Sequence, residues 1–301
     1  MRTAELLPPG VVMDIGGTNY RSAVWQDGVL GPTTVIDTPS DPADFFASLD
    51  EVVARAQQDQ GAQWATVMAP CPVKRQPDGT YVMGPAPNIA GMNGEHNLNE
   101  ETRIKKGVTV IVDNDVQGLA AASAAKYGND YPDTESFSAI GAGTGIGGGQ
   151  VDRDPRNRGL FHPNPARLEI GHDPATDDIA GPTFEDLYSG RGLEERFGMP
   201  GEELSAPEIW REVGAGLAKL VLRMGLYPGG GLVTIGGAVG SRRAADYGPA
   251  LRSELDRFRK SDNPMRHLLP EVRIVPKEQE KNFALYGGAV LARSAMVRGA
   301  A

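Results

Sequence analysis

Two stretches of this chain share one pattern, in which a short strand leads through a glycine-rich turn into a second strand. The first joins residues 11–13 to residues 20–25 through Asp14-Ile15-Gly16-Gly17-Thr18. The second leads from residues 136–140 through the glycine-rich residues 141–149 into a further short strand. A hairpin that occurs twice in this way indicates an internal duplication at the scale of a domain. We therefore expect an α/β fold with two lobes.

Hydrophobic periodicity predicts further helices and strands around the two hairpins. Pro42, which follows two residues that cap helices well, begins a helix expected to end near residue 60. Apolar runs at 66–69 and 108–112 are typical of buried strands. Helical spacing covers residues 208–224 and 282–296.

Chain length predicts how these elements are grouped. A length of 301 residues is large for one hydrophobic core. We expect a small N-terminal α/β lobe at residues 1–115 and a larger α/β lobe at residues 116–281. The last helix, at about residues 282–298, is expected to pack back on the first lobe.

Charge and cysteine content exclude several classes of protein. The formal net charge is −9, from 39 acidic and 30 basic residues, so no nucleic-acid partner is expected and local donors must hold any phosphate. Cys71 is the one cysteine, which rules out an intrachain disulfide and a cysteine-based zinc site and fits a reducing, cytoplasmic setting. Neither a signal peptide nor a run of about 18 apolar residues occurs, so no membrane partner is expected.

The composition of the first turn suits phosphate binding. Gly16 and Gly17 carry no side chains, so backbone N–H groups can approach a phosphate closely, and Thr18 adds a hydroxyl donor. Asp14 offers an oxygen suited to hydrated Mg²⁺. A glycine pair alone would fit an ordinary hairpin turn with positive φ. The flanking aspartate and threonine favour phosphate binding.

The second turn raises another possibility, because residues 143–148 match the GxGxxG pattern of dinucleotide-binding proteins. In that fold the glycines open a helix whose N-terminus faces the pyrophosphate. Here they lead into Gln150-Val151-Asp152 without helical periodicity. A nicotinamide-dependent dehydrogenase is therefore disfavoured. No GxxxxGK[ST] sequence occurs, so a P-loop is excluded as well.

Six motifs together resemble one family. They are DIGGTNYR at 14–21, PNIAG at 87–91, DNDVQGLAAA at 113–122, GAGTGIGGG at 141–149, EIGH at 169–172 and TIGGAVG at 234–240. In this order and spacing the chain resembles the ROK and bacterial glucokinase branch of the superfamily of sugar kinases, actin and heat-shock ATPases. The resemblance covers nearly the whole chain, down to YGGAVLA at 286–292. It implies a two-lobed actin-like ATPase fold of the ribonuclease H-like type, each lobe being a mixed sheet flanked by helices.

The resemblance also implies roles in a kinase that uses ATP and Mg²⁺. Asp115 would be the catalytic base for a sugar hydroxyl, although the local sequence also fits a helix N-cap. Because a carboxylate of ordinary pKa, about 3.9, cannot ionise such a hydroxyl beforehand, its proton is expected to move late. Asp14 would hold Mg²⁺ through water. The implied nucleotide-binding residues are Asp14, Gly16, Gly17 and Thr18 in the first turn, Gly143, Thr144 and Gly145 in the second, and Gly236 and Gly237 in a third loop near adenosine.

The resemblance assigns the sugar to five polar residues: Asn88, Asn114, Glu169, His172 and Glu185. A carboxylate and an imidazole spaced like Glu169 and His172 would bind adjacent sugar hydroxyls. Asn88 would equally suit a turn. Two departures from the family matter. No cysteine-rich zinc loop follows the EIGH motif, so zinc is not expected, and Met92 stands where relatives often have tryptophan.

The expected function is ATP-dependent phosphorylation of a hexose, with the 6-hydroxyl of glucose as the default acceptor, by a homodimer as is common among relatives. An amino sugar or a cyclitol as the acceptor, and polyphosphate as the donor, stay open. Asp173, Asp177 and Asp178 would either form a solvated loop or favour an amino sugar. A sugar-sensing repressor would need a helix-turn-helix, and only 13 residues precede Asp14. A chaperone-like or cytoskeletal ATPase would not need the EIGH and PNIAG motifs.

Overall fold

The computed structural model describes residues 7–86, 88–102, 107–164, 170–225 and 231–299. Contacts divide the chain into two units, one running to Gly118 and resuming at Asn282, the other spanning Leu119–Lys281. Both divisions fall inside helices, α3 (Asp115–Tyr127) and α9 (Glu280–Val297), so each of these helices contributes to both units. The boundary proposed from the sequence lies at the start of α3.

The first unit is built on a mixed sheet with strand order β3-β2-β1-β5-β9, and β4 pairs with β2. Its strands are β1 (Gly10–Asp14), β2 (Asn19–Gln26), β3 (Val29–Leu30), β4 (Thr34–Asp37), β5 (Trp64–Ala69) and β9 (Thr109–Asn114). β1 and β2 are antiparallel, whereas β1, β5 and β9 run parallel. The carboxyl ends of these three parallel strands therefore meet at one edge. A second, small sheet contains β6 (Val73–Arg75), β7 (Tyr81–Met83) and β8 (His96–Asn97), which leads into the short helix α2 (Leu98–Glu101).

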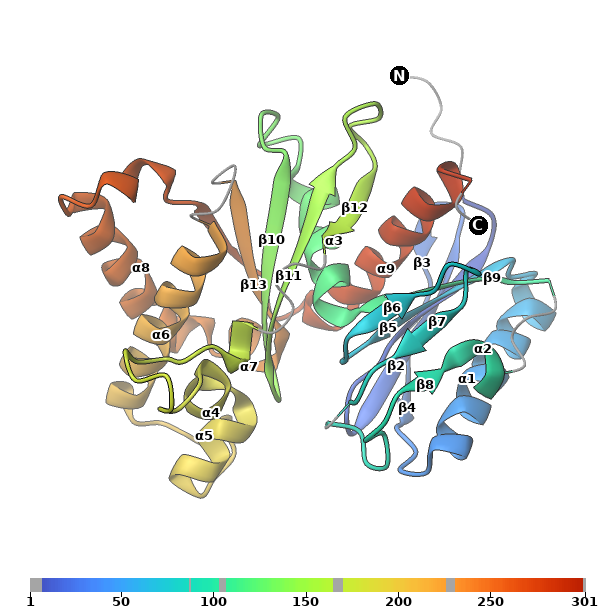
Figure 1. Cartoon of the computed structure of the whole chain (residues 1–301), viewed down its shortest axis with the longest axis horizontal. Helices are drawn as coiled ribbons and strands as arrows, with labels where there is room; N and C mark the ends of the chain where they lie inside the picture. Colours follow the sequence, from blue (N-terminus) through green and yellow to red (C-terminus); the bar gives the residue numbers. More distant parts are fainter. Residues whose placement is uncertain (1–6, 87, 103–106, 165–169, 226–230, 300–301) are drawn as a thin grey trace. The chain divides into compact units, whose positions relative to one another are not determined.

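Helices cover both faces of the main sheet of the first unit (Figure 1). On one face α1 (Pro42–Gln60) packs with the side chains of Val11 and Met13 in a single apolar core. On the other face α9 approaches so closely that a Cβ on Gly288 would lie 2.5 Å from the side chain of Val12. The predicted helix start at Pro42 is confirmed, because Asp41 caps α1 by accepting hydrogen bonds from the first turn of the helix.

The second unit contains a five-stranded sheet with order β12-β11-β10-β13-β14. Its strands are β10 (Ser136–Ala142), β11 (Ile146–Arg153), β12 (Phe161–Asn164), β13 (Leu232–Gly236) and β14 (Glu271–Ile274). Two long helices, α6 (Pro207–Gly225) and α8 (Ala244–Lys260), lie side by side, and α6 packs on β10 and β13 (Figure 1). The shorter helices are η1 (Ile170–His172), α4 (Phe184–Tyr188), α5 (Gly190–Phe197), α7 (Gly237–Arg242) and η2 (Pro264–Leu268). The strand β11 confirms that no helix follows the GxGxxG match.

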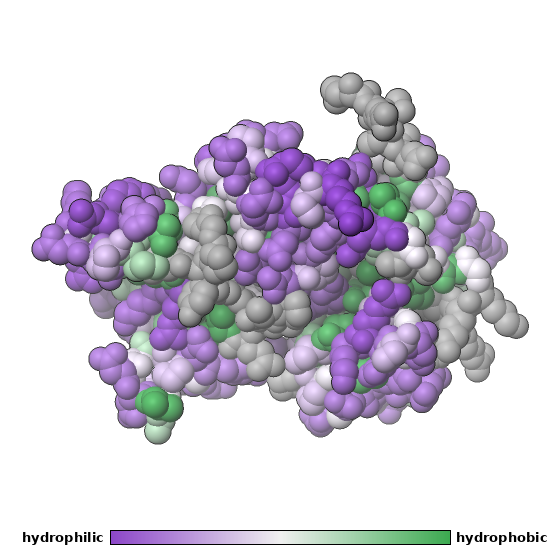
Figure 2. All heavy atoms as spheres, turned by 45° about the horizontal axis from the view of Figure 1, so that its top comes forward, coloured by the Kyte–Doolittle hydropathy of each residue, from purple (hydrophilic) through white to green (hydrophobic). Residues whose placement is uncertain are grey.

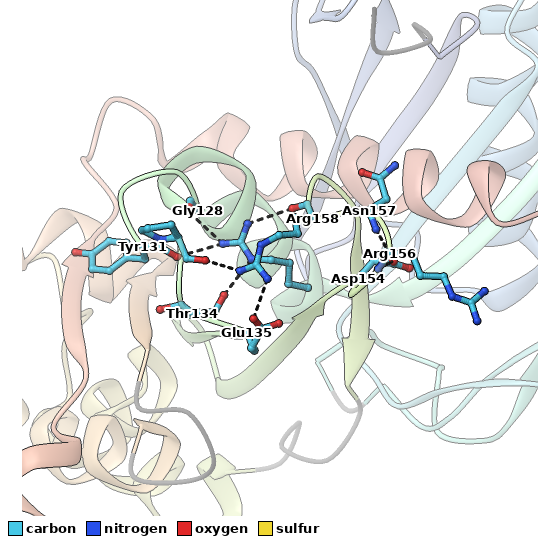
Figure 3. A network of polar contacts seen from close by, with 10 residues as sticks. Gly128, Tyr131, Thr134, Glu135, Asp154, Arg156, Asn157 and Arg158 are labelled. Carbon is cyan, nitrogen blue, oxygen red and sulfur yellow. Dashed lines mark hydrogen bonds and ion pairs between the residues drawn. The ribbon is translucent and has the colours of Figure 1, made fainter. Parts of the chain in front are cut away.

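A buried arginine fixes two loops of the second unit. Arg153, at the end of β11, is only 8% exposed, and its guanidinium lies 5.0 and 5.6 Å from the ring centroids of Phe137 and Phe161. It donates hydrogen bonds to the backbone oxygens of Gly128, Tyr131, Thr134 and Arg158 (Figure 3). These bonds satisfy a buried cation and join the loop before β10 to the loop between β11 and β12.

The face shown in Figure 2 is mainly polar. Figure 2 shows hydrophilic residues over most of the visible face, with small apolar spots between them. Within the part of the chain that the structure describes, no helix combines the length and the apolar character needed to span a bilayer.

Candidate active site

The turn between β1 and β2 brings the predicted residues of the first phosphate loop together in the first unit. Close packing, not positive φ, requires its glycines: a Cβ on Gly17 would lie 2.1 Å from the backbone oxygen of Asn88, and one on Gly16 would lie 2.6 Å from that of Asn19. Thr18 is exposed. No described residue accepts a hydrogen bond from the backbone N–H of Gly16, Gly17 or Thr18. The turn therefore presents donors that an anion can use.

Asp14 lies at the carboxyl edge of the parallel strands. Its side chain is 16% exposed, and its Oδ2 lies 3.8 Å from Nη1 of Arg21, its antiparallel partner on β2. The parallel register pairs Asp14 with Met68 on β5, and Met68 with Asp113 on β9. The residues that follow Asp113 therefore come to the same edge as Asp14.

Asp115 begins α3 directly after β9 and is partly buried. Burial, and second the negative charge of Asp14, raise the pKa of its carboxyl group from 3.8 to about 7. The backbone N–H of Val116, 2.8 Å from Oδ1, opposes this rise. This raised pKa differs from the ordinary value expected from the sequence, because neither the burial of Asp115 nor the approach of Asp14 is visible in the sequence. A carboxyl group with a pKa near 7 is well matched to general base catalysis at neutral pH.

Asn114 is 7% exposed, and its side chain makes structural hydrogen bonds. Its Nδ2 donates to the backbone oxygen of Cys71 at 3.0 Å, and its Oδ1 accepts from the backbone N–H of Val116 at 3.0 Å. The side chains of Asn114 and Asp115 both accept from the N–H of Val116 and so cap α3 together. The sequence suggested this capping role for Asp115 alone. Burial, and then the charge of Asp115, raise the pKa of the Cys71 thiol to about 12, so this thiol stays neutral beside the carboxyl group.

The turn between β10 and β11 is the corresponding feature of the second unit. The backbone N–H of Gly143 donates to the oxygen of Gly145 at 2.9 Å, which closes the turn. The oxygens of Gly143 and Thr144 accept from the backbone N–H groups of Gly190 and Arg191 at 2.7 and 3.2 Å. The N–H groups at the start of α5 thus donate to the carbonyl oxygens of the turn and hold the turn against that helix. No described residue accepts a hydrogen bond from the N–H of Thr144 or Gly145.

Glu185, on α4, also holds this turn. Its Oε2 accepts from the backbone N–H of Ile146 at 2.8 Å, and its Oε1 accepts from Nη2 of Arg191 at 2.7 Å. The side chain is only 12% exposed. The structure therefore places a predicted sugar residue in an ion pair directly behind the second turn.

His172 lies close to the same turn. The preceding Gly171 packs on β11, since a Cβ there would lie 2.1 Å from the oxygen of Ile146. His172 itself is exposed and near Asp186, whose pKa is lowered first by hydrogen bonds from Thr183 and also by this histidine. Glu169, the other predicted residue of the EIGH motif, lies outside the described residues.

The glycines at 236–237 stand where β13 passes into a helix. Gly237 has φ +85°, and a Cβ there would lie 2.6 Å from the oxygen of Ala142 on β10, so glycine is required on both counts. The sequence predicted a loop at this point, whereas the helix α7 begins at Gly237. Six residues are too few for helical periodicity to reveal.

A cavity of about 420 Å³ adjoins both glycine segments of the second unit. Gly143 and Thr144 of the turn and Ala238 of α7 line it. Five charged residues line it as well: Arg191, Glu194, Glu202, Arg242 and Arg243. Its size is within the range of small-molecule sites. None of these five residues was expected from the sequence, although the SGRGLEE and GSRR segments adjoin predicted motifs.

The comparisons with known proteins decide the family. A family model described as "ROK family" matches residues 11–294, which is most of the chain. The chain belongs to the ROK family. No curated protein matches the sequence significantly.

Solved structures support the fold of this ROK protein. A ROK family glucokinase from Streptomyces griseus in complex with glucose and AMPPNP aligns over 95% of this chain and 99% of its own, with a TM-score of 0.69 and 20% identity. A ROK hexokinase from Thermus thermophilus aligns over 97% of this chain and 99% of its own, with a TM-score of 0.66 and 23% identity. An inorganic polyphosphate/ATP-glucomannokinase from Arthrobacter sp. strain KM aligns over 96% of this chain and 100% of its own, with a TM-score of 0.66 and 22% identity. The predicted two-lobed actin-like ATPase fold is confirmed.

The predicted site residues that the structure describes are divided between the two units of this ROK protein. The first group is Asp14, Gly16, Gly17, Thr18, Asn88, Asn114 and Asp115, and the second is Gly143, Thr144, Gly145, His172, Glu185, Gly236 and Gly237. Among the described residues, no three His, Cys, Asp or Glu side chains are placed to hold a metal ion together. Mg²⁺ often uses only one or two carboxylates with phosphate oxygens and water. Asp14 fits that role, because its carboxylate lies beside the donors of the first turn.

Proposed function

We propose that this protein is an ATP-dependent sugar kinase whose general base is Asp115. One observation carries the proposal: Asp115 begins α3 directly after β9, at the sheet edge where the parallel strands also place Asp14. Burial and the charge of Asp14 raise the pKa of Asp115 to about 7, which fits this role. Two carboxyl groups in different surroundings can take different tasks. Asp115 would accept the proton, and Asp14 would hold Mg²⁺.

The raised pKa gives Asp115 a definite chemical role. As the bond from the sugar oxygen to the γ-phosphorus forms, the bond from that phosphorus to the bridging oxygen breaks and ADP leaves. The hydroxyl becomes more acidic during this exchange, and its proton passes to the Asp115 carboxylate. A base with a pKa of about 7 takes that proton more readily than an ordinary carboxylate, yet it is largely ionised at slightly alkaline pH. Such a base typically accelerates the reaction about 10²–10⁴-fold. Bound Mg²⁺ would neutralise charge on the phosphate oxygens.

We assign the nucleotide to the donors of both turns and to the cavity of the second unit. The N–H groups of Gly16, Gly17, Thr144 and Gly145 would bind phosphate oxygens. Glu194 and Glu202 on the cavity wall can accept hydrogen bonds from ribose hydroxyls, which suits a nucleotide donor. The similar S. griseus structure contains AMPPNP, which supports a nucleotide donor.

We assign the sugar to Asn88, Asn114, Glu169, His172 and Glu185 and propose glucose as the default substrate. Asp173 bears on the amino-sugar alternative. Its Oδ2 accepts from Nη1 of Arg223 at 2.9 Å, so its negative charge is already compensated. This pairing favours a neutral hexose over a cationic amino sugar.

A sugar panel tests the proposal. ADP release would be followed with ATP or polyphosphate and with glucose, mannose, fructose, glucosamine, N-acetylglucosamine and inositol. We expect ATP-dependent turnover with a neutral hexose, and none with polyphosphate. Absence of turnover with every sugar, in a preparation that binds ATP, would refute the kinase assignment.

Two parts of the proposal rest on the family resemblance and have simple tests. We propose that the metal is Mg²⁺, so EDTA should abolish turnover and added Mg²⁺ should restore it. We also propose a homodimer, which sedimentation equilibrium would measure directly. Full turnover in excess EDTA, or a monomer at micromolar concentration, would contradict the respective part.

A further inference from the structure

Arg191 stands where two features of the second unit meet. Its backbone N–H donates to the oxygen of Thr144 at 3.2 Å, so the residue is fixed beside the glycine turn. Its Nη2 donates to Oε1 of Glu185 at 2.7 Å. The same residue lines the cavity of about 420 Å³ together with Gly143 and Thr144. The Arg191 side chain thus contacts Glu185, a predicted sugar-binding residue, and borders the cavity that we assign to the nucleotide.

The other two arginines of the cavity contact other parts of the second unit. Arg243 donates to the oxygen of Leu204 at 2.6 Å and stacks 4.3 Å from the ring centroid of Trp210. Arg242 pairs with Glu280 on α9 at 3.3 Å. Their side chains are 21% and 33% exposed, compared with 41% for Arg191. Arg191 is also the one of the three that adjoins the turn.

We propose that the Arg191 guanidinium binds the terminal phosphates of the nucleotide and that Glu185 holds it in position. This inference rests on the proposed function, which places a nucleotide in the cavity. The chain carries a net charge of −9, so a polyphosphate ester needs a local cation besides the dipoles of the turn. A guanidinium carries five N–H donors in a planar fork, so it can serve a carboxylate and a phosphate together.

Glu185 is the positioning residue in this arrangement. One carboxylate oxygen fixes the backbone of Ile146 at the end of the turn, and the other fixes Arg191. The turn and the cation are therefore aligned by the same side chain. Since a carboxylate offers about four acceptor positions, Glu185 retains capacity for a sugar hydroxyl. A sugar hydroxyl bound to Glu185 would therefore be linked to the guanidinium of Arg191 by the Glu185 side chain alone.

Equilibrium binding of ATP, ADP and AMP tests the proposal without turnover. Arg191→Met removes the charge and keeps much of the length, and we expect affinity for ATP and ADP to fall about 10- to 100-fold while affinity for AMP stays within about twofold. Arg191→Lys should lose less, because it keeps the charge but not the planar fork. Arg196→Met is the matched control, since Arg196 lies on the same helix and pairs with Glu212 outside the cavity lining.

The pattern across nucleotides distinguishes the alternatives. Unchanged ATP affinity in folded Arg191→Met overturns the proposal while leaving the kinase assignment intact. Equal loss for ATP and AMP overturns it too, because Arg191 would then support only the cavity wall. If Arg191→Met does not fold by circular dichroism, Arg191→Lys decides between the same outcomes.

The ion pair has its own measurement. We expect Glu185→Gln to weaken ATP binding in wild type but to have little further effect in Arg191→Met. Additive losses in this double-mutant cycle would show that Glu185 does not act through Arg191 and would overturn the positioning part.

Discussion

The two glycine turns have the same place in their hairpins but different surroundings. In the first unit a Cβ on Gly17 would lie 2.1 Å from the oxygen of Asn88. In the second unit a Cβ on Gly143 would lie 3.9 Å from the backbone nitrogen of Ala238. The first turn is therefore packed against its own unit, whereas the second borders an open cavity.

The charges beside the turns differ as well. Asp14 and Asp115 lie near the first turn, and the charge of one raises the pKa of the other. Beside the second turn the Glu185 carboxylate is paired with Arg191. We infer a division of chemistry, in which both turns supply N–H donors for phosphate, the first unit adds carboxylates for the proton and the metal, and the second unit adds a cation.

Asp115→Asn should give the largest effect. The amide keeps the shape but cannot accept the hydroxyl proton, so we expect kcat to fall about 10²–10⁴-fold or more, with sugar affinity within about an order of magnitude of wild type. Asp113→Asn is the matched control, because Asp113 lies near the end of β9, two residues before Asp115. Its Oδ1 accepts a hydrogen bond from the N–H of Asn114 at 2.9 Å, and the amide oxygen of asparagine can accept the same bond. Near-normal turnover by Asp115→Asn would refute the role of the first unit.

The pH profile should show the same carboxyl group. Asp115 must be ionised to accept a proton, and its pKa is about 7. Activity should therefore be lost as the pH falls through this value, so kcat/KM for the sugar should drop about tenfold per pH unit below it. A profile that stays flat down to pH of about 5 would show that no group of this pKa controls the reaction.

Alanine at equivalent glycines measures the difference in packing. Gly17→Ala should destabilise the protein by about 1–3 kcal/mol and raise the KM for ATP, because the new methyl group collides with backbone. Gly143→Ala should change stability by less than about 0.5 kcal/mol, since space is available. Urea denaturation with ATP kinetics gives both quantities. Equal destabilisation by the two substitutions would remove the distinction between the turns.

The smallest effect concerns stability. Burial raises the pKa of Asp113 from 3.8 to about 7, so the folded state binds more protons than the unfolded state between these values. Stability should therefore fall as the pH rises from about 4 to 7. Asp113→Asn should reduce that fall by on the order of 1–2 kcal/mol, which urea denaturation at pH of about 5 and 8 would detect. An unchanged difference between variant and wild type at the two pH values would contradict the assignment.

Local features could be predicted from the sequence, and long-range pairings could not. The cap at Asp41, the helix that follows and the two glycine turns depend on neighbouring residues, and all are present. The bond from Ile146 to Glu185 spans 39 positions, and periodicity carries no information about such a pair. The raised pKa of Asp115 likewise depends on strand order, which brings the ends of β1 and β9 to one edge.

A crystal structure with the sugar identified by the panel would test the role of Asp115 most directly. We expect one sugar hydroxyl within about 2.6–3.2 Å of the Asp115 carboxylate. A bound sugar with every hydroxyl beyond hydrogen-bond reach of that carboxylate would contradict it.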